Sequence, residues 1–217
     1  MDLNVSVDRE QWTPFLNVIN SLCIVGENTE YFTMNPERIF SSSYSCKQIF
    51  TQYGIEDAES LTNFLTWVKD DSCCEEYEEI RNRLSVMSQE ERSAFLRLSK
   101  LAPEKMHRLH VVNDSIMQMP SSGIKGYYYG LSIFYAYIGE TLKYIDEKDK
   151  WDHISLVLPK ILASYASWRE LIHVFQVGQM YHSSTLSRDI PVYNKNMMIK
   201  LLTSPRSPIL KTGVWSS

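Results

Sequence analysis

Polar side chains that could form a reaction centre are sparse in this 217-residue chain. Asp149 and His153 are spaced i,i+4, so a helix would put both on one face, where the carboxylate could orient the imidazole as a general base. An exposed helical pair without a catalytic role explains the same spacing more simply. Ser183 follows His182 directly, but adjacent residues seldom point at each other as a nucleophile and its base must. We therefore expect no catalytic residues and a protein that is not an enzyme.

Cysteine and histidine side chains offer a second kind of chemistry, metal binding. Cys73 and Cys74, together with His107 and His110, could supply four soft ligands to zinc. Adjacent cysteines rarely bind one tetrahedral ion, because structural zinc sites separate them by two to four residues. Reduced thiols that act as small apolar side chains are the simpler interpretation. We expect neither a metal ion nor a cofactor.

The charge of the chain is unevenly distributed. The net charge is −4, and no basic stripe of the kind that binds nucleic acid is present, so we expect no nucleic-acid partner. Residues 1–100 carry 17 acidic and 9 basic side chains, whereas residues 101–217 carry 9 and 13. The acidic excess is concentrated in one short segment, whose candidate partner-binding residues are Asp70, Asp71, Glu75, Glu76, Tyr77, Glu78 and Glu79.

This acidic segment has two interpretations. The simpler one is a solvated helix face with intrahelical pairs such as Glu79–Arg83. The functional one is an electronegative surface that steers a basic protein partner, with exposed aromatic residues supplying most of the affinity. In that case the Asn28–Ser43 loop, with Tyr31 and Phe32, is expected to join the surface.

The overall composition favours an ordered, cytoplasmic protein. Hydrophobic residues make up 44% of the chain and aromatic residues 12%, enough to offset the entropy of ordering. No apolar run approaches the roughly 18 residues of a membrane span, so no membrane association is expected. The first residues, MDLNVSVDREQW, lack the basic and apolar regions of a signal peptide.

Helical patterns follow one another along the chain and predict an all-α fold. The segment Ile124–Leu142 is apolar nearly all round, which predicts a helix buried at the centre of the domain. Amphipathic helices over Asp57–Lys69, Glu147–Tyr165 and Trp168–Tyr181 are expected to surround it. We expect a single globular helical domain over residues 1–203 with a less regular N-terminal loop. Residues 204–217, broken by two Ser-Pro pairs, are expected to form a loop or arm.

Local signals place several helix ends. Thr13-Pro14 resembles a cap followed by a first-turn proline. Ser88 with Glu91 and Ser167 with Glu170 have the spacing of capping boxes. Gly54 is expected to end the preceding helix in the left-handed conformation.

Some of these segments together resemble a known family. An acidic turn and a helix with Leu61, Leu65, Trp67 and Val68 occupy the segment IEDAESLTNFLTWV. Downstream come Tyr144-Ile145-Asp146-Glu147, Trp151, Ser167-Trp168-Arg169-Glu170, and Phe175 three residues before Gly178. Over roughly residues 54–181 this combination resembles a bacterial domain-of-unknown-function family, number 1266 in the DUF series. The resemblance implies a small, mostly helical protein without an established reaction.

The chain departs from that family at the central helix. The resemblance implies an Asp and two Arg there, at the positions of Tyr128, Leu131 and Tyr137 in this sequence. If those polar residues form a site in relatives, this chain has lost it. If they form a buried ion network, packing replaces it here.

Taken together, these patterns favour a non-enzymatic interaction protein. We expect an immunity protein (antitoxin) that binds and neutralises a secreted bacterial toxin with a basic surface. An enzyme with a scattered active site, or a regulatory or structural subunit of another complex, remain the alternatives.

Overall fold

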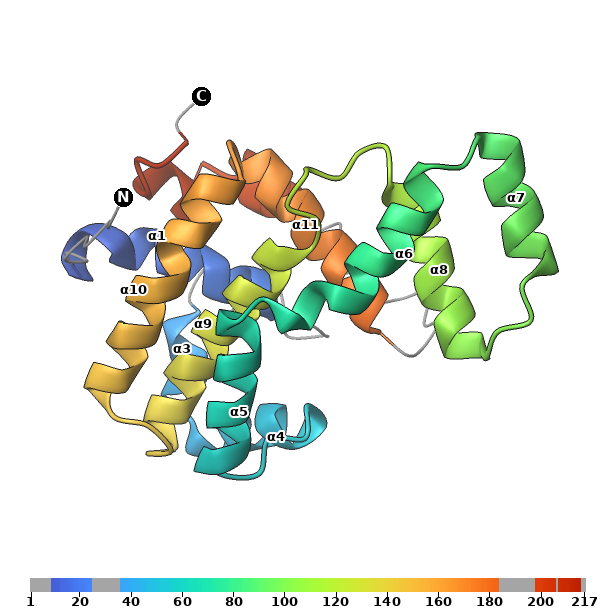
Figure 1. The fold of residues 1–217 in the computed structure, drawn as a ribbon. Coiled ribbons are helices and arrows are strands. Elements are labelled where there is room, and N and C mark those ends of the chain that lie inside the picture. The colour runs from blue at the N-terminus through green and yellow to red at the C-terminus, as the bar shows by residue number, and fades with distance from the viewer. Residues whose placement is uncertain (1–8, 25–35, 184–197, 206, 216–217) are drawn as a thin grey trace.

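The computed structural model describes residues 9–24, 36–183, 198–205 and 207–215, and within these ranges every regular element is helical (Figure 1). This confirms the predicted all-α class. The labelled α-helices are α1 (Arg9–Cys23), α3 (Glu37–Phe40), α4 (Ser43–Gln52), α5 (Ala58–Lys69), α6 (Glu75–Ser85), α7 (Gln89–Leu98), α8 (Pro103–Ser115), α9 (Lys125–Thr141), α10 (Glu147–Ser164) and α11 (Trp168–His182), and residues 198–203 are also helical. Two 3-10 turns are η1 (Ser72–Cys74) and η2 (Pro208–Lys211). Among these helices none is both long enough and apolar enough to cross a bilayer.

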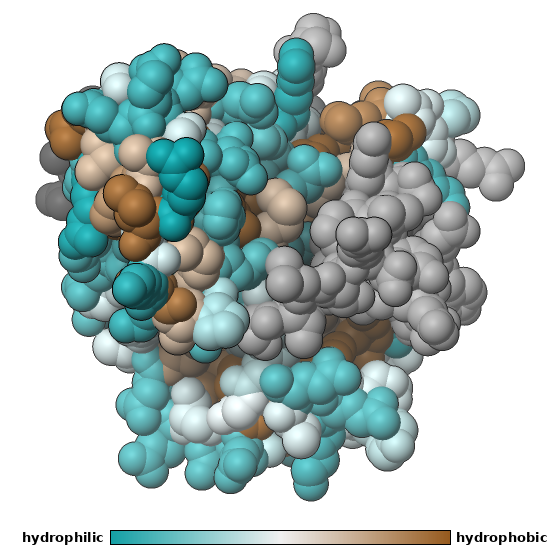
Figure 2. All heavy atoms as spheres, turned by 90° about the vertical axis from the view of Figure 1, so that its right-hand side faces the viewer, coloured by the Kyte–Doolittle hydropathy of each residue, from teal (hydrophilic) through white to brown (hydrophobic). Residues whose placement is uncertain are grey.

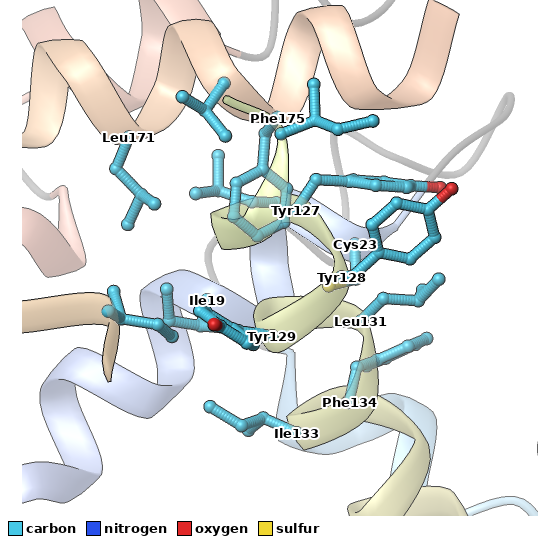
Figure 3. Packing of buried hydrophobic residues seen from close by; sticks show 14 of the residues in the cluster. Ile19, Cys23, Tyr127, Tyr128, Tyr129, Leu131, Ile133, Phe134, Leu171 and Phe175 are labelled. Atoms are coloured by element: carbon cyan, nitrogen blue, oxygen red, sulfur yellow. The ribbon is translucent and has the colours of Figure 1, made fainter. Parts of the chain in front are cut away.

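Helix α9 is the centre of the fold, as its lack of a polar face predicts. It is buried from Gly126 to Ala136 without interruption and packs against α1, α5, α10 and α11 (Figures 1 and 3). The neighbouring helices approach closely because glycines face them. A Cβ at Gly130 would overlap the ring of Phe175 on α11, and a Cβ at Gly139 would overlap Leu61 on α5. These two positions set the distance between α9 and its neighbours.

Most predicted helix ends are confirmed by their hydrogen bonds. Asp57 caps α5 by accepting from the Ser60 N–H at 2.8 Å. Ser88 and Glu91 form the predicted reciprocal capping box of α7. Gly54 follows α4 with φ +69°. Such bonds are local, so the sequence alone contains their signal.

The predicted start of α1 is wrong. The helix begins at Arg9, and Pro14 lies inside it instead of at its first turn. The Thr13 hydroxyl donates to the Arg9 carbonyl at 2.7 Å and is therefore part of the helix. Proline removes one backbone N–H from the ladder. The burial of Phe15, Leu16 and the rest of the apolar face outweighs that loss.

Residues 207–215, within the predicted C-terminal loop or arm, pack onto α1. Trp215 lies 5.6 Å from the Phe15 ring and 5.2 Å from the Trp168 ring, measured between centroids. The Trp168 indole N–H donates to the Val214 carbonyl at 3.0 Å. Trp168 is therefore a packing residue that joins α11 to this tail and to α1.

Helices α6, α7 and α8 form a projection that we call the α6–α8 lobe, and Figure 1 shows α7 at the end farthest from α9. Within the lobe α8 contacts both α6 and α7, and α8 also packs on α11. Helix α7 has no buried residue, although Phe95 and Leu96 are partly covered. Within the lobe, α7 is thus the least enclosed helix.

Candidate functional site

The acidic segment predicted as a binding surface is divided between two places. Asp70 ends α5, and Asp71 follows it with φ 61°, in the left-handed region that Asp adopts more readily than most residues. Glu75, Glu76, Glu78 and Glu79 lie on α6. Tyr31 and Phe32, expected to join them, lie outside the described residues.

Tyr77 does not serve as the exposed aromatic anchor that the sequence suggested. Its side chain is 1% exposed, and its ring lies 5.4 Å from the Tyr181 ring in an edge-on arrangement. It lies on the face of α6 that packs into the fold, about two helical turns before the buried Leu84. The expectation that Tyr77 is exposed is therefore wrong, and any apolar contact on this surface must come from other residues.

Arginine side chains compensate much of the negative charge on α6. Arg108 pairs with Glu76 and also with Glu104, and Arg83 pairs with Glu79 at 3.0 Å. Asp70 and Glu75 are exposed and form no ion pair within the described residues. The predicted intrahelical pairing thus holds for Glu79, and Glu76 is compensated from α8 instead, whereas Asp70 and Glu75 keep their charge available.

A groove of about 210 Å³ lies between the three helices of the lobe. Its apolar lining consists of Ile80, Phe95, Leu101 and Leu109, and its charged lining of Glu76, Glu79, Arg83 and Lys105. Val86 and Leu98, at the ends of α6 and α7, are 83% and 73% exposed. Figure 2 looks at the molecule from this end and shows hydrophobic spheres lying between hydrophilic ones. The lobe therefore combines apolar and acidic surface.

A larger polar pocket, of about 670 Å³, opens where the ends of α5 and α10 meet α6 and the start of α9. Asp71 connects the side chains that form one wall of this pocket. The Tyr129 hydroxyl donates to Asp71 Oδ1 at 2.6 Å, Lys160 Nζ donates to the same oxygen at 3.0 Å, and Lys125 Nζ lies 3.5 Å from Oδ2. We call these four residues the Asp71 cluster.

The Asp71 cluster shifts the titration of its members. Burial raises the pKa of Asp71, but the hydrogen bonds from Tyr129 and Lys160 and the charges of Lys160 and Lys125 together bring that pKa below its ordinary value. Burial, and then the bond to Asp71, raise the pKa of the Tyr129 hydroxyl. The carboxylate is therefore ionised and the phenol neutral at neutral pH.

The loop before α9 completes the pocket. Arg81 donates to the carbonyls of Pro120 and Ser121 at 2.9 and 2.8 Å and so ties this loop to α6. Gly123, with φ +57°, approaches α6 so closely that a Cβ would overlap the Glu78 carboxylate. The remaining lining is mostly polar, from Asn82, Ser121, Ser122 and Ser164, with Ala163 as its apolar member.

The histidine considered as a base is not in an exposed pair. His153 is 7% exposed, and its Nε2 lies 2.9 Å from the hydroxyl of Ser132, itself fully buried on α9. Asp149 is exposed, and no hydrogen bond joins it to His153. Burial, followed by the charges of Lys69 and Lys160, lowers the pKa of His153 to about 4. The expectation of an exposed helical pair is wrong because His153 lies on the inner face of α10.

The residues considered for zinc do not come together. Cys73 and Cys74 are both buried, with their Sγ atoms 3.5 Å apart. His107 Nε2 instead lies 2.7 Å from the Met180 carbonyl. Within the ranges that the structure describes, no three His, Cys, Asp or Glu side chains are grouped as metal ligands would be.

The three positions where the family resemblance implies polar residues are occupied by packing residues. Tyr128 and Leu131 are 4% and 3% exposed. Tyr137 stacks on Phe40 with ring centroids 5.1 Å apart, and the Lys150 ammonium lies 4.8 Å from the Tyr137 centroid. In this chain these positions contribute to the core and to its edge.

Comparison with known proteins gave one result. Neither the curated proteins nor the solved structures contained a match. The profile of one family, described as protein of unknown function (DUF1266), matches residues 48–215, a longer stretch than the resemblance seen in the motifs. Because the match covers most of the 217 residues, the chain belongs to the DUF1266 family.

Proposed function

We propose that this protein acts by binding another protein, as an immunity protein (antitoxin) that neutralises a secreted bacterial toxin with a basic surface. The observation that carries the proposal is the apolar groove of the projecting α6–α8 lobe together with two uncompensated acidic residues, Glu75 at the start of α6 and Asp70 at the end of α5. The DUF1266 family itself has no known function, so the proposal rests on this chain's own surface.

The apolar part of the lobe offers binding energy. Leu98 and Val86 are mostly exposed, and Phe95 and Leu101 line the groove beside them. Covering such a side chain fully contributes about 1.5–3 kcal/mol, and anchors of this kind usually carry most of the affinity of an interface. A partner that inserts apolar residues into the groove gains this energy without rearranging α7, because α7 has no buried residue to displace.

The charged part of the lobe determines which partner it attracts. Residues 70–98 carry eight acidic and four basic side chains. Asp70 and Glu75 have no ion-pair partner within the described residues, so their charge acts outward. Complementary charge raises the association rate of a basic partner and suppresses acidic ones. A toxin that acts on nucleic acid commonly presents such a basic surface, which this lobe would cover.

The test is co-expression with the toxin encoded beside this gene, scored by cell survival, followed by binding measurements on the purified proteins at about 50 and 300 mM salt. Leu98→Ser should weaken binding about tenfold by removing an apolar anchor. Glu75→Lys should slow association at the low salt concentration and have little effect at the high one. Leu210→Ser, which removes an equally exposed leucine from η2, is the control and should bind as the wild type does.

Two outcomes contradict the proposal. If a toxin binds and neither Leu98→Ser nor Glu75→Lys changes the binding, the interface lies outside the lobe. If no neighbouring gene encodes a toxin that this protein neutralises, the immunity role itself is wrong.

A further inference from the structure

The polar pocket beside α9 contains two lysine ammonium groups whose hydrogen-bonding capacity is not fully used within the fold. Lys160 Nζ makes two hydrogen bonds, to Asp71 and to the Lys69 carbonyl at 2.7 Å, and an ammonium has a third N–H to donate. The closest ion-pair partner of Lys125 Nζ is Asp71, at 3.5 Å. Both lysine side chains are about one third exposed, so their remaining N–H groups are accessible from the pocket.

The electrostatic balance of the pocket favours an anion. Asp71 and Glu78 carry the negative charges, and Lys125, Lys160 and the adjacent Arg81 carry the positive ones. Lys125 is also the first residue of α9, so the positive end of a 17-residue helix dipole lies at the same place. Asp71 fixes the two ammonium groups in position while cancelling only part of their charge.

The remaining lining indicates what kind of anion fits. Asn82, Ser121 and Ser122 supply amide and hydroxyl groups, which pair well with ligand hydroxyls. The aromatic ring in the lining, Tyr129, is 2% exposed and is covered by the Lys160 ammonium at 5.3 Å from its centroid. No open aromatic face is therefore available among the lining residues for a base to stack on. The volume of about 670 Å³ lies within the range of small-molecule sites.

From these observations we infer that the pocket between α6, α9 and α10 binds a small phosphorylated polyol, of the sugar-phosphate class. Lys125 and Lys160 would hold the phosphate, and Asn82 with the serines would bind the hydroxyl groups. This pocket shares no lining residue with the groove of the α6–α8 lobe, and the inference does not rest on the proposed protein partner.

The probe for this site is glucose 6-phosphate, titrated into the full chain by isothermal calorimetry with glucose and inorganic phosphate as separate arms. We expect saturable one-to-one binding of glucose 6-phosphate, weaker binding of phosphate and no binding of glucose. Lys125→Gln should weaken the binding about fivefold or more, as expected for one ammonium near a phosphate at the protein surface. Lys148→Gln is the control, because Lys148 lies on α10 with Lys160 but is 79% exposed and pairs with Asp152.

A second variant tests the sign of the charge. Asp71→Asn keeps the size of the side chain, fits a left-handed backbone and still accepts hydrogen bonds, but it removes a negative charge from the wall. An anion should therefore bind Asp71→Asn more tightly than the wild type, about fivefold or more. Circular dichroism melts of each variant establish that it is folded before titration.

Several results overturn the inference. If glucose 6-phosphate does not bind, or if it binds Lys125→Gln as tightly as Lys148→Gln, then no anion is bound at this site. If glucose binds as tightly as glucose 6-phosphate, the two lysines do not contribute to binding. If inorganic phosphate binds as tightly as glucose 6-phosphate, the groups expected to bind the ligand hydroxyls do not contribute to binding. Weaker binding to folded Asp71→Asn would contradict the argument that the negative charge of Asp71 opposes the anion.

Discussion

The buried histidine on α10 makes the stability of this protein depend on pH in a way that one substitution isolates. Ser132 Oγ lies 2.8 Å from the Tyr129 carbonyl, to which it donates its proton. His153 Nε2 must then carry the proton of the bond to Ser132. Charging that ring is opposed first by burial and then by Lys69 and Lys160, which lower its pKa from 6.5 to about 4.

The sign and size of the effect follow from this shift. Because the folded state has the lower pKa, the unfolded state binds more protons between pH 6.5 and 4, so the stabilisation is complete above pH 6.5 and is lost as the pH falls toward 4. The difference between 6.5 and about 4 corresponds to ~3.4 kcal/mol in all. By pH 5, about 2 kcal/mol of it should be gone.

The measurement is urea unfolding followed by tryptophan fluorescence at pH 7.5, 6 and 5. His153→Gln keeps a donor for Ser132 but cannot titrate, so between pH 7.5 and 5 it should lose about 2 kcal/mol less than the wild type. His110→Gln removes an exposed histidine from α8 and should follow the wild type. Acid-sensitive carboxylates such as Asp71 affect all three proteins equally. Parallel losses in the wild type and His153→Gln would refute the reasoning.

Three further predictions concern the packing of buried side chains. Phe134→Ala removes a ring that is 2% exposed and should cost ~3–5 kcal/mol in denaturant titration; a loss below about 1 kcal/mol would contradict the central position of α9. Trp168→Phe loses the hydrogen bond to Val214 and should cost about 1 kcal/mol without weakening partner binding. If this variant instead melts normally and no longer binds, Trp168 belongs to the interface. Gly130→Ala should destabilise by about 1–3 kcal/mol because its Cβ meets the Phe175 ring, and a raised melting temperature would contradict this.

Much of the fold could be predicted because its signals are local or periodic. The capping residues Asp57 and Ser88 act within three residues of their own position. The apolar circumference of α9 indicates burial without knowledge of its neighbours. One error was also avoidable, since Tyr77, Ile80 and Leu84 share one helical face and indicate that Tyr77 points inward.

The Asp71 cluster could not be predicted in the same way. Asp71, Tyr129 and Lys160 are far apart in the sequence and meet only after α5, α9 and α10 have packed together. In the sequence alone, Asp71 and Lys160 have the pattern of surface charges and Tyr129 has that of a core residue. The exposed fraction of Leu98 depends likewise on how α7 sits against α8, which no spacing in the sequence determines.

The packing of α1 has a consequence for synthesis of the chain. Its apolar face is covered by α9, α11 and η2, whose residues follow it by a hundred positions or more. At typical translation rates of 5–20 residues per second, that face stays uncovered on the ribosome for roughly 10 to 40 seconds, until residues beyond 207 have emerged. Among the described helices, those that precede α9 make at most minor contacts with α1, so nascent chains should engage holding chaperones through Phe15, Leu16 and their neighbours.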